Sequence, residues 1–135
     1  MTTHKIFNFA ANMENKVKFL GYQKDVTPFL NESDIFCMCT RWEAFGRTTV
    51  EAMLSGNLVI GANTAGTKDL INDGVTGILY EQGNAEDLCE KMVSVINNKS
   101  KSKEIAKSGR QYMFDNMSSE KNADEIYNVY MEILD

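Results

Sequence analysis

The stretch that decides the fold runs from residue 35 to residue 56 and reads IFCMCTRWEAFGRTTVEAMLSG. Its first part, Ile35–Cys39, is apolar at every position, as expected of a strand that is buried on both faces of a parallel sheet. From about Gly46 to Leu54 the pattern becomes helical. The stretch therefore predicts a buried strand that leads directly into a helix, which is the unit from which parallel sheets are built.

The alternation of strand and helix continues on both sides of this stretch. Further strands are predicted at Val17–Gly21, Leu58–Ile60 and Gly77–Tyr80, and short helices are predicted over 27–31 and 68–71. Predicted strands begin about every 20 residues, which leaves room for a crossover helix between one strand and the next. We therefore expect an α/β fold with a parallel sheet.

Helical patterns flank the alternating region at both ends of the chain. The first 16 residues read as one helix, with apolar positions at Ile6, Phe9, Ala10 and Met13. From about residue 84 the chain is predicted to be helical, and Asn84 is expected to cap the first of these helices with Asp87 in the capping-box position. The polar run 97–102 predicts a break in the helix rather than a domain linker.

Two more helices are predicted after that break, over about 103–116 and from Ser118 or Ser119 onward. The last helix carries an apolar stripe at helical spacing, formed by Ala123, Ile126, Tyr127, Tyr130, Ile133 and Leu134. We expect this stripe to be core or a surface that packs on another domain. Because no basic residues flank it, the pattern argues against a helix that lies on a membrane surface.

The composition is that of one globular domain. Its 135 residues carry 19 acidic and 14 basic side chains, a net charge of −5, and this acidic balance argues against nucleic acid as a partner. No apolar run approaches the roughly 20 residues that span a bilayer, so no transmembrane segment is expected. The opening residues, MTTHKIFNF, lack the apolar core of a secretory signal. We therefore expect a cytoplasmic protein.

The three cysteines do not form a metal-binding pattern. Cys37 and Cys39 have C-x-C spacing, and neither a histidine nor Cys89 lies near enough in the sequence to complete a zinc site. We expect all three to be buried, reduced thiols that act as small apolar side chains.

Candidate binding residues follow the central strand directly. In open α/β sheets ligands bind beyond the carboxyl ends of the strands, which is where Glu43, Phe45 and Gly46 are expected. If the next helix begins at Gly46, the N–H groups of Gly46, Arg47 and Thr48 point outward beside the positive end of the helix dipole. This arrangement predicts a phosphate site.

A second carboxylate lies further along the same helix. At 1.5 Å per residue, Glu51 is about 7–8 Å beyond the helix start, a distance that suits a hydroxyl-bearing group attached to the phosphate, such as a ribose. On spacing alone, an ordinary helix cap at Glu43 and a surface glutamate at Glu51 remain an open alternative.

Five segments, in register, resemble the retaining glycosyltransferases called group 1 or family 4, which have the GT-B fold. They are EAFGRTTVEAMLSG at 43–56, VKFLGY at 17–22, SDIF at 33–36, VIG at 59–61 and DGVTGILY at 73–80. The resemblance covers about residues 16–80, and the following helices match more loosely. It implies a Rossmann-like parallel sheet flanked by helices, part of the C-terminal nucleotide-sugar-binding half of a GT-B fold, with a helical tail. Residues 1–135 would then be a single, partial donor-binding domain.

The resemblance implies a role for each candidate residue. Glu43 corresponds to the catalytic carboxylate that contacts the hydroxyls of the donor sugar. The backbone around Phe45, Gly46 and Arg47 would hold the sugar and the diphosphate, and Thr48 would lie close by. Glu51 and Tyr22 would contact the donor nucleotide.

By the same resemblance, Glu51 would hydrogen-bond the ribose and Tyr22 would lie near the base. The implied reaction is transfer of a hexosyl group from a nucleoside diphosphate sugar to a glycan or lipid-linked acceptor, with retention of configuration, in polysaccharide biosynthesis. No metal or other cofactor is implied. The N-terminal acceptor domain of the family, and its phosphate-binding Arg and Lys segments, are missing from this sequence, so the isolated chain is expected to be inactive alone.

Two positions depart from the family pattern. Residues 65–69, AGTKD, stand where the family has a Gly-Gly loop followed by Glu, and Asn57 stands where it usually has Pro. Two other functions stay open beside the transferase: a nucleotide-sugar epimerase of the same fold, and a non-catalytic module that binds a nucleotide or a partner.

Overall fold

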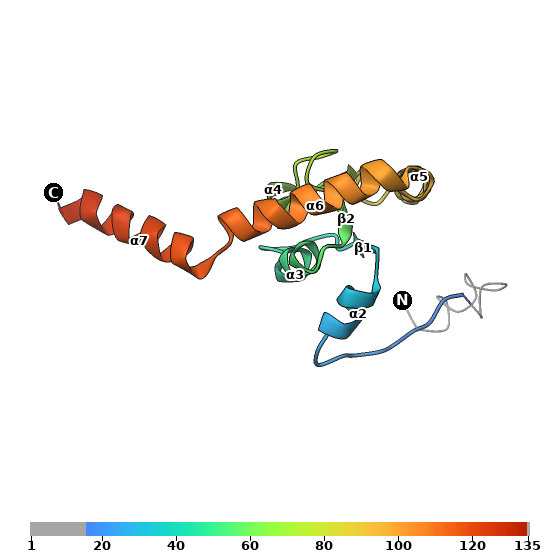
Figure 1. Ribbon diagram of the computed structural model, residues 1–135, viewed down its shortest axis with the longest axis horizontal. Coiled ribbons are helices and arrows are strands. Elements are labelled where there is room, and N and C mark those ends of the chain that lie inside the picture. Colours follow the sequence, from blue (N-terminus) through green and yellow to red (C-terminus); the bar gives the residue numbers. More distant parts are fainter. Residues whose placement is uncertain (1–15, 135) are drawn as a thin grey trace.

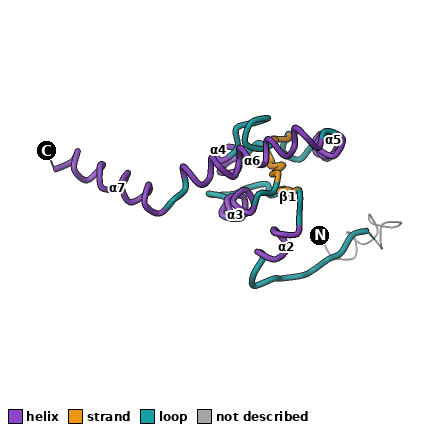
Figure 2. Tube along the Cα trace, viewed as in Figure 1, coloured by secondary structure: helices purple, strands orange, loops and turns teal. Residues whose placement is uncertain are grey.

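The computed structural model describes residues 16–134, which form one parallel sheet flanked by helices (Figure 1). The strands are β1 (Ile35–Met38), β2 (Leu58–Ala62) and β3 (Ile78–Tyr80), and they lie in the order β1-β2-β3 (Figure 2). Both neighbouring pairs are parallel, and the first residue of β1 lies opposite the first residue of β2. The predicted α/β fold with a parallel sheet is confirmed.

Helices join the strands and then continue to the end of the chain. They are α2 (Thr27–Glu32), α3 (Arg47–Ser55), α4 (Ala65–Leu70), α5 (Ala85–Asn97), α6 (Lys99–Asn116) and α7 (Ser119–Leu134). Helix α3 connects β1 to β2, and α4 connects β2 to β3, so each parallel pair has the crossover helix that the strand spacing predicted.

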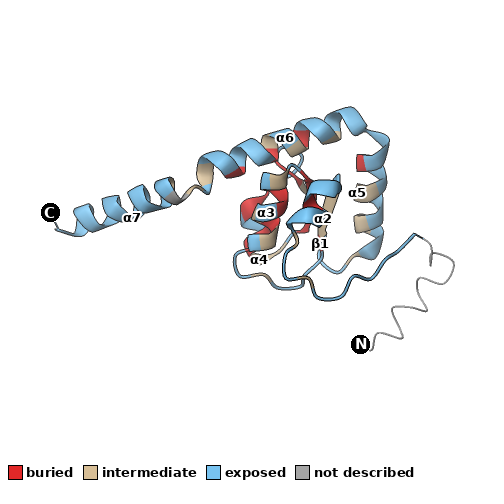
Figure 3. Ribbon diagram, turned by 60° about the horizontal axis from the view of Figure 1, so that its bottom comes forward, coloured by how far each residue is buried: buried red, intermediate tan, exposed pale blue. Residues whose placement is uncertain are grey.

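The core lies on both faces of β2, which is buried along its whole length. On one face, Val59 packs in a cluster with Leu30, Ala52, Met53, Leu70, Ile71 and Met113. On the other face, the alternate residues of β2 pack in a cluster of Leu58, Ile60, Ala62, Tyr80, Val95 and Ile105. Figure 3 shows this buried centre in red between α3 and α6. A central parallel strand covered on both faces explains why its sequence is apolar without alternation.

Helix α6 comes very close to the rest of the fold at Gly109. A Cβ atom at this position would overlap the backbone carbonyl of Thr76 and would lie 3.0 Å from Cε of Met53. Gly109 therefore allows the helix backbone to pass directly over the turn that precedes β3. This contact holds α6 against α3 and the sheet.

Asparagine side chains start the last two helices of the folded core. The Asn84 Oδ1 atom accepts a hydrogen bond of 3.0 Å from the Asp87 backbone N–H, which confirms the predicted cap. The Asp87 carboxylate accepts from the Glu81 N–H at 2.6 Å, three residues before the cap. At the predicted break, Asn98 caps α6 through the Lys101 N–H, so the break is much shorter than the polar run suggested.

The side chain of Asn57 ties α2 to the start of β2. Its Nδ2 atom donates a hydrogen bond of 2.9 Å to the Leu30 carbonyl and a second one to the Ser33 carbonyl, and Asn57 is 1% exposed. A proline here would supply neither bond. The residue that departs from the family pattern thus has a structural role in this chain.

The prediction of a strand at Val17–Gly21 is wrong. This segment is extended but is not part of the sheet, and the side chains of Val17, Phe19 and Leu20 are exposed. It runs into α2 away from the three strands (Figure 1). A β-rich sequence forms a strand only beside another strand that completes its backbone hydrogen bonds, and here neither β1 nor β3 lies next to it. The helix predicted for the first 16 residues falls almost wholly outside the described residues.

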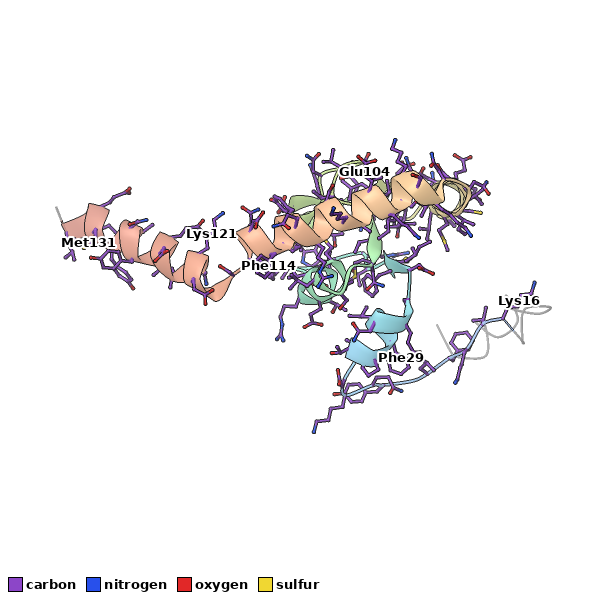
Figure 4. The ribbon with its side chains drawn as sticks, in the orientation of Figure 1. Lys16, Phe29, Glu104, Phe114, Lys121 and Met131 are labelled. Atoms are coloured by element: carbon purple, nitrogen blue, oxygen red, sulfur yellow. The ribbon has the colours of Figure 1, made fainter. Side chains whose placement is uncertain are left out.

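Helix α7 forms as predicted, but its apolar stripe is not core. Ile126, Tyr127, Tyr130, Ile133 and Leu134 are all exposed. Figures 1 and 3 show the helix projecting from the end of α6, and Figure 4 shows the α7 side chains, with Lys121 and Met131 labelled, standing clear of the sheet. The periodicity of the stripe predicted the helix correctly, whereas the burial of the stripe depends on a surface that residues 16–118 do not offer.

Candidate functional site

Three loops meet at the carboxyl ends of the strands. The loop after β1 spans residues 39–46. The Gly66 N–H, at the start of α4, donates a hydrogen bond of 2.9 Å to the Glu43 carbonyl, and the Gln82 side chain, after β3, donates to the Arg41 carbonyl. The first loop is therefore held by the loops that follow both other strands. This edge is where ligands bind in open α/β sheets.

Gly66 allows the second of these contacts to be close. A Cβ atom at Gly66 would lie 2.7 Å from the Ala44 carbonyl oxygen and 2.9 Å from Cα of Phe45. Gly66 thus lets the backbone at the start of α4 pack against the backbone of the loop after β1. It is the one glycine of the family's Gly-Gly loop that this sequence retains.

Gly46 sets the direction in which α3 leaves this loop. It is the N-cap residue of α3 and has φ +93°, a left-handed conformation that glycine adopts without strain. It is buried, and a Cβ atom would lie 2.9 Å from Cδ1 of Leu70. Since Gly46 has no side chain, it cannot cap the helix itself, and the group at the helix N-terminus comes from the preceding loop.

The carboxylate of Glu43 lies at the N-terminus of α3. Its Oε1 atom accepts a hydrogen bond of 3.2 Å from the Gly46 N–H, and the Glu43 side chain is half-buried. A negative charge at this end of a helix is favourable because the helix dipole is positive there. Glu43 therefore occupies the position that the sequence assigned to an anion.

Arg47 and Glu51 face each other one helical turn apart. Arg47 Nη2 lies 3.8 Å from Glu51 Oε1, and the two side chains are 85% and 46% exposed. A pair this exposed contributes little to stability. Arg47 also places a cation in the first turn of α3, which contains no acidic residue and where the helix dipole disfavours positive charge. Both side chains are thus available at the surface of α3.

The remaining predicted residues lie at different distances from this centre. Thr48 is half-buried in the first turn of α3, and the Phe45 side chain is exposed in the loop beside it. Trp42 is 80% exposed in the same loop. Tyr22 is 91% exposed in the segment that leads into α2, and the described residues show no hydrogen bond from it to the candidate site. The structure brings together Glu43, Phe45, Gly46, Arg47, Thr48 and Glu51; their ligand contacts stay predictions.

Thr49 also lies in the first turn of α3, although the sequence pattern did not single it out. This residue is fully buried in α3, and within the described part of the chain its Oγ1 atom has no hydrogen-bond partner. The atom lies 3.5 Å from the point where a Cβ on Gly46 would be, and Cγ of Glu43 lies 3.5 Å from the same point. A hydroxyl three residues after an N-cap glycine was a usable sequence signal, because that residue lies in the same turn as the cap.

Two thiols and a phenol lie at the same edge of the sheet. Burial raises the pKa of the Cys37 thiol to about 11, with a further contribution from Cys39. Burial, followed by a hydrogen bond with Cys39, raises the pKa of Tyr80 to about 12. The prediction that all cysteines are buried is wrong for Cys39 and Cys89, which are exposed. Cys39 lies just beyond the end of β1, and Cys89 lies on α5, whose outer face is open to solvent.

Neither a metal cluster nor a membrane span is found in residues 16–134. No three His, Cys, Asp or Glu side chains of this region are close enough together to hold a metal ion. None of its helices is both long and apolar enough to cross a bilayer. A cavity of about 420 Å³ lies at the opposite end of the sheet, where Ile35 and Leu58 begin β1 and β2. The candidate site is therefore defined by the loops at the carboxyl edge and not by that cavity.

Proteins of similar sequence match this chain over most of its length. The family described as "Glycosyl transferases group 1" matches residues 6–112. The N-acetyl-alpha-D-glucosaminyl L-malate synthase of Bacillus anthracis is 27% identical over 123 residues, which are 91% of this chain and 32% of that protein. An uncharacterized glycosyltransferase of Methanocaldococcus jannaschii is 31% identical over 134 residues, 97% of this chain and 38% of that protein. The chain thus spans about a third of the length of these relatives.

Solved structures of similar fold include glycosyltransferases with bound nucleotide. Anabaena HepE in complex with UDP has a TM-score of 0.88 at 26% identity, over 96% of this chain and 36% of HepE. HepE has also been crystallised with UDP-glucose. A glycosyltransferase from Rickettsia africae has a TM-score of 0.85 at 30% identity, over 98% of this chain and 36% of that one. With the motif, the parallel sheet and these relatives in agreement, the chain belongs to the group 1 glycosyltransferases and has part of the C-terminal half of their GT-B fold.

Proposed function

We propose that this chain binds the nucleotide-sugar donor of a hexosyltransferase at the N-terminus of α3. The observation that carries the proposal is the conformation of Gly46, which aims the first N–H of α3 at the loop edge and leaves it to an anion from outside the helix. The similarity to HepE, which binds UDP and UDP-glucose, supports a nucleoside diphosphate as that anion.

Each part of the donor has a partner in this proposal. The N–H groups of Gly46, Arg47 and Thr48 hold the diphosphate, and Glu43 accepts hydrogen bonds from the sugar hydroxyls. Glu51 accepts from the ribose, and Tyr22 lies against the base. The bond between the anomeric carbon and the diphosphate oxygen breaks, the acceptor oxygen bonds to that carbon on the same face, and the proton of the acceptor hydroxyl passes to the departing diphosphate. The departing diphosphate is an anion, and preorganised N–H donors stabilise it in the transition state.

The acceptor side of the reaction belongs to a longer protein. Because the chain spans about a third of its relatives, we propose that an N-terminal domain supplies the other wall of the cleft and the acceptor site. A Staphylococcus aureus relative, CapM, is a capsular polysaccharide biosynthesis glycosyltransferase, and it supports a glycan or lipid-linked acceptor. We propose transfer with retention, without a metal and in the cytoplasm.

Ligand-detected NMR of this chain with UDP, GDP, ADP and their glucose esters tests the donor site. One nucleotide is expected to bind. Glu51→Ala is expected to weaken the binding of this nucleotide about tenfold, because a hydrogen bond to a charged group is lost. Glu90→Ala, an exposed glutamate on α5, is the matched control and should leave binding unchanged. Binding that is indifferent to Glu51, or no binding of any nucleotide, would contradict the proposal.

A further inference from the structure

The interaction that closes the N-terminus of α3 comes from a proposed catalytic side chain. Glu43 Oε1 lies 3.2 Å from the Gly46 nitrogen, and Gly46 itself is buried at the N-cap. The same N–H is the first of the donors proposed to hold the diphosphate. A phosphate oxygen and the Glu43 carboxylate therefore compete for one N–H group.

We infer that this competition makes Glu43 a specificity-determining residue, which favours the sugar-bearing donor over the free nucleoside diphosphate. The inference rests on the proposed function, because it concerns the same donor site. A nucleotide that binds here moves the Glu43 carboxylate off Gly46. What the carboxylate meets next differs between the two nucleotides.

With a nucleotide sugar, the displaced carboxylate meets hydroxyl groups. These donate hydrogen bonds, and bonds to a charged acceptor are the stronger kind. With a free nucleoside diphosphate, it meets a terminal phosphate, which carries additional negative charge near neutral pH because its second ionisation has a pKa of about 6. Two anions a few ångströms apart repel each other, and more strongly where solvent is partly excluded. The product is therefore bound more weakly than the donor.

Two further polar side chains lie around the N-terminus of α3. The buried Thr49 hydroxyl has no hydrogen-bond partner among the described residues, and it lies as close to the Cβ position of Gly46 as Cγ of Glu43 does. Nearby, the weak pair of Arg47 and Glu51 keeps a cation within the same turn. The N-terminus of α3 thus carries an exposed guanidinium that the Glu43–Gly46 bond does not use and that can donate to a phosphate, while the Thr49 hydroxyl beside Gly46 stays buried.

The test compares UDP, GDP and ADP, each beside its glucose ester, by titration calorimetry on the chain and on Glu43→Ala and Glu43→Gln variants. For the base that binds, we expect Glu43→Ala to tighten the free diphosphate about tenfold and to weaken the glucose ester about tenfold. Glu43→Gln, which keeps the shape but loses the charge, should also tighten the free diphosphate. Glu32→Gln, at an exposed position on α2, is the control and should change neither.

Three results would overturn the inference, and they are distinguishable. The first is that the free diphosphate binds the chain and that neither variant binds it more tightly. This result overturns the inference but leaves the proposed donor site intact. A glucose ester unaffected by either variant does the same. If no nucleotide binds the chain or its variants, the proposed function fails as well. Circular dichroism checks that each variant is folded. If Glu43→Ala does not fold, the comparison of Glu43→Gln with the parent chain decides the test.

Discussion

Single residues at the carboxyl edge of the sheet combine structural demands with chemical ones. Gly46 has a left-handed φ and no space for a Cβ, so its identity follows from packing against Leu70 as well as from the proposed approach of a ligand. Cys37 and Tyr80 lie at the same edge, and burial raises both of their pKa values. Because these two pKa values are raised, the stability of the folded chain depends on pH in the alkaline range.

The chain should lose stability as the pH rises above about 9. The pKa of Cys37 is about 11 in the folded chain against 9.0 for the ordinary thiol, and that of Tyr80 is about 12 against 10.0. The unfolded chain therefore releases these protons first, so the free energy of unfolding falls between pH 9 and 11 for Cys37 and between 10 and 12 for Tyr80. Below pH 9 the contribution is fully present. Urea unfolding at a series of pH values measures the fall.

Matched variants separate the two groups in that experiment. Cys37→Ala should flatten the fall between pH 9 and 11, and Tyr80→Phe should flatten it between pH 10 and 12. Cys89→Ala, at an exposed thiol, should leave the profile as it is. A profile unchanged by both Cys37→Ala and Tyr80→Phe would refute the assignment.

At the scale of elements, the fold depends on where helices approach the sheet. Helix α6 contributes Ile105 to one core cluster and Met113 to the other, so it packs against both core clusters. It reaches that position because Gly109 allows its backbone to pass over Thr76. The N-terminal half of α6, beyond this contact, is more exposed.

Gly109→Ala should therefore destabilise the chain although alanine is the better helix former. The new Cβ meets a backbone carbonyl, which cannot move aside as a side chain can, and overpacking of this kind costs about 1–3 kcal/mol. Ser100→Ala, in the exposed first turn of the same helix, is the control and should change stability by less than about 0.5 kcal/mol. Chemical denaturation measures both variants. Equal stability of Gly109→Ala and the parent chain would show that α6 packs less closely than described.

At the scale of the whole molecule, the sheet with α2 to α6 forms a packed body, and α7 extends from it (Figures 1 and 3). The apolar stripe of α7 is exposed over several turns. Exposed apolar surface of this extent promotes association in water. The body itself does not depend on α7 for its core, since both core clusters consist of residues before it.

The isolated chain should consequently self-associate through α7. Sedimentation velocity at rising protein concentration is expected to show oligomers, and Tyr130→Lys, within the stripe, should reduce them. Asn128→Lys adds the same charge on the opposite side of the helix and serves as the control. A chain shortened to residues 1–118 should remain monomeric, with its free energy of unfolding within about 1 kcal/mol of the parent. Oligomers that persist in the shortened chain would place the contact elsewhere.

Local pattern was enough to predict most elements and the family. The apolar run at 35–39, the cap at Asn84 and the period of α7 each depend on neighbours in the sequence, and all three elements form. The motif from Glu43 to Gly56 likewise predicted the start of α3 at Gly46 within one residue. Such features are determined by the sequence itself, because backbone dihedral preferences, caps and hydrophobic periodicity act over a few residues.

Contacts between distant residues were decided only by the tertiary structure. The segment at Val17–Gly21 has a strand-like sequence and yet is no strand, because a strand needs a partner beside it. The exposure of Cys39, the unpartnered hydroxyl of Thr49 and the bond from Glu43 to Gly46 depend on how loops pack at the edge of the sheet. The same apolar period builds a helix whether or not another surface covers it, so only the tertiary structure could reveal that the stripe of α7 lies exposed.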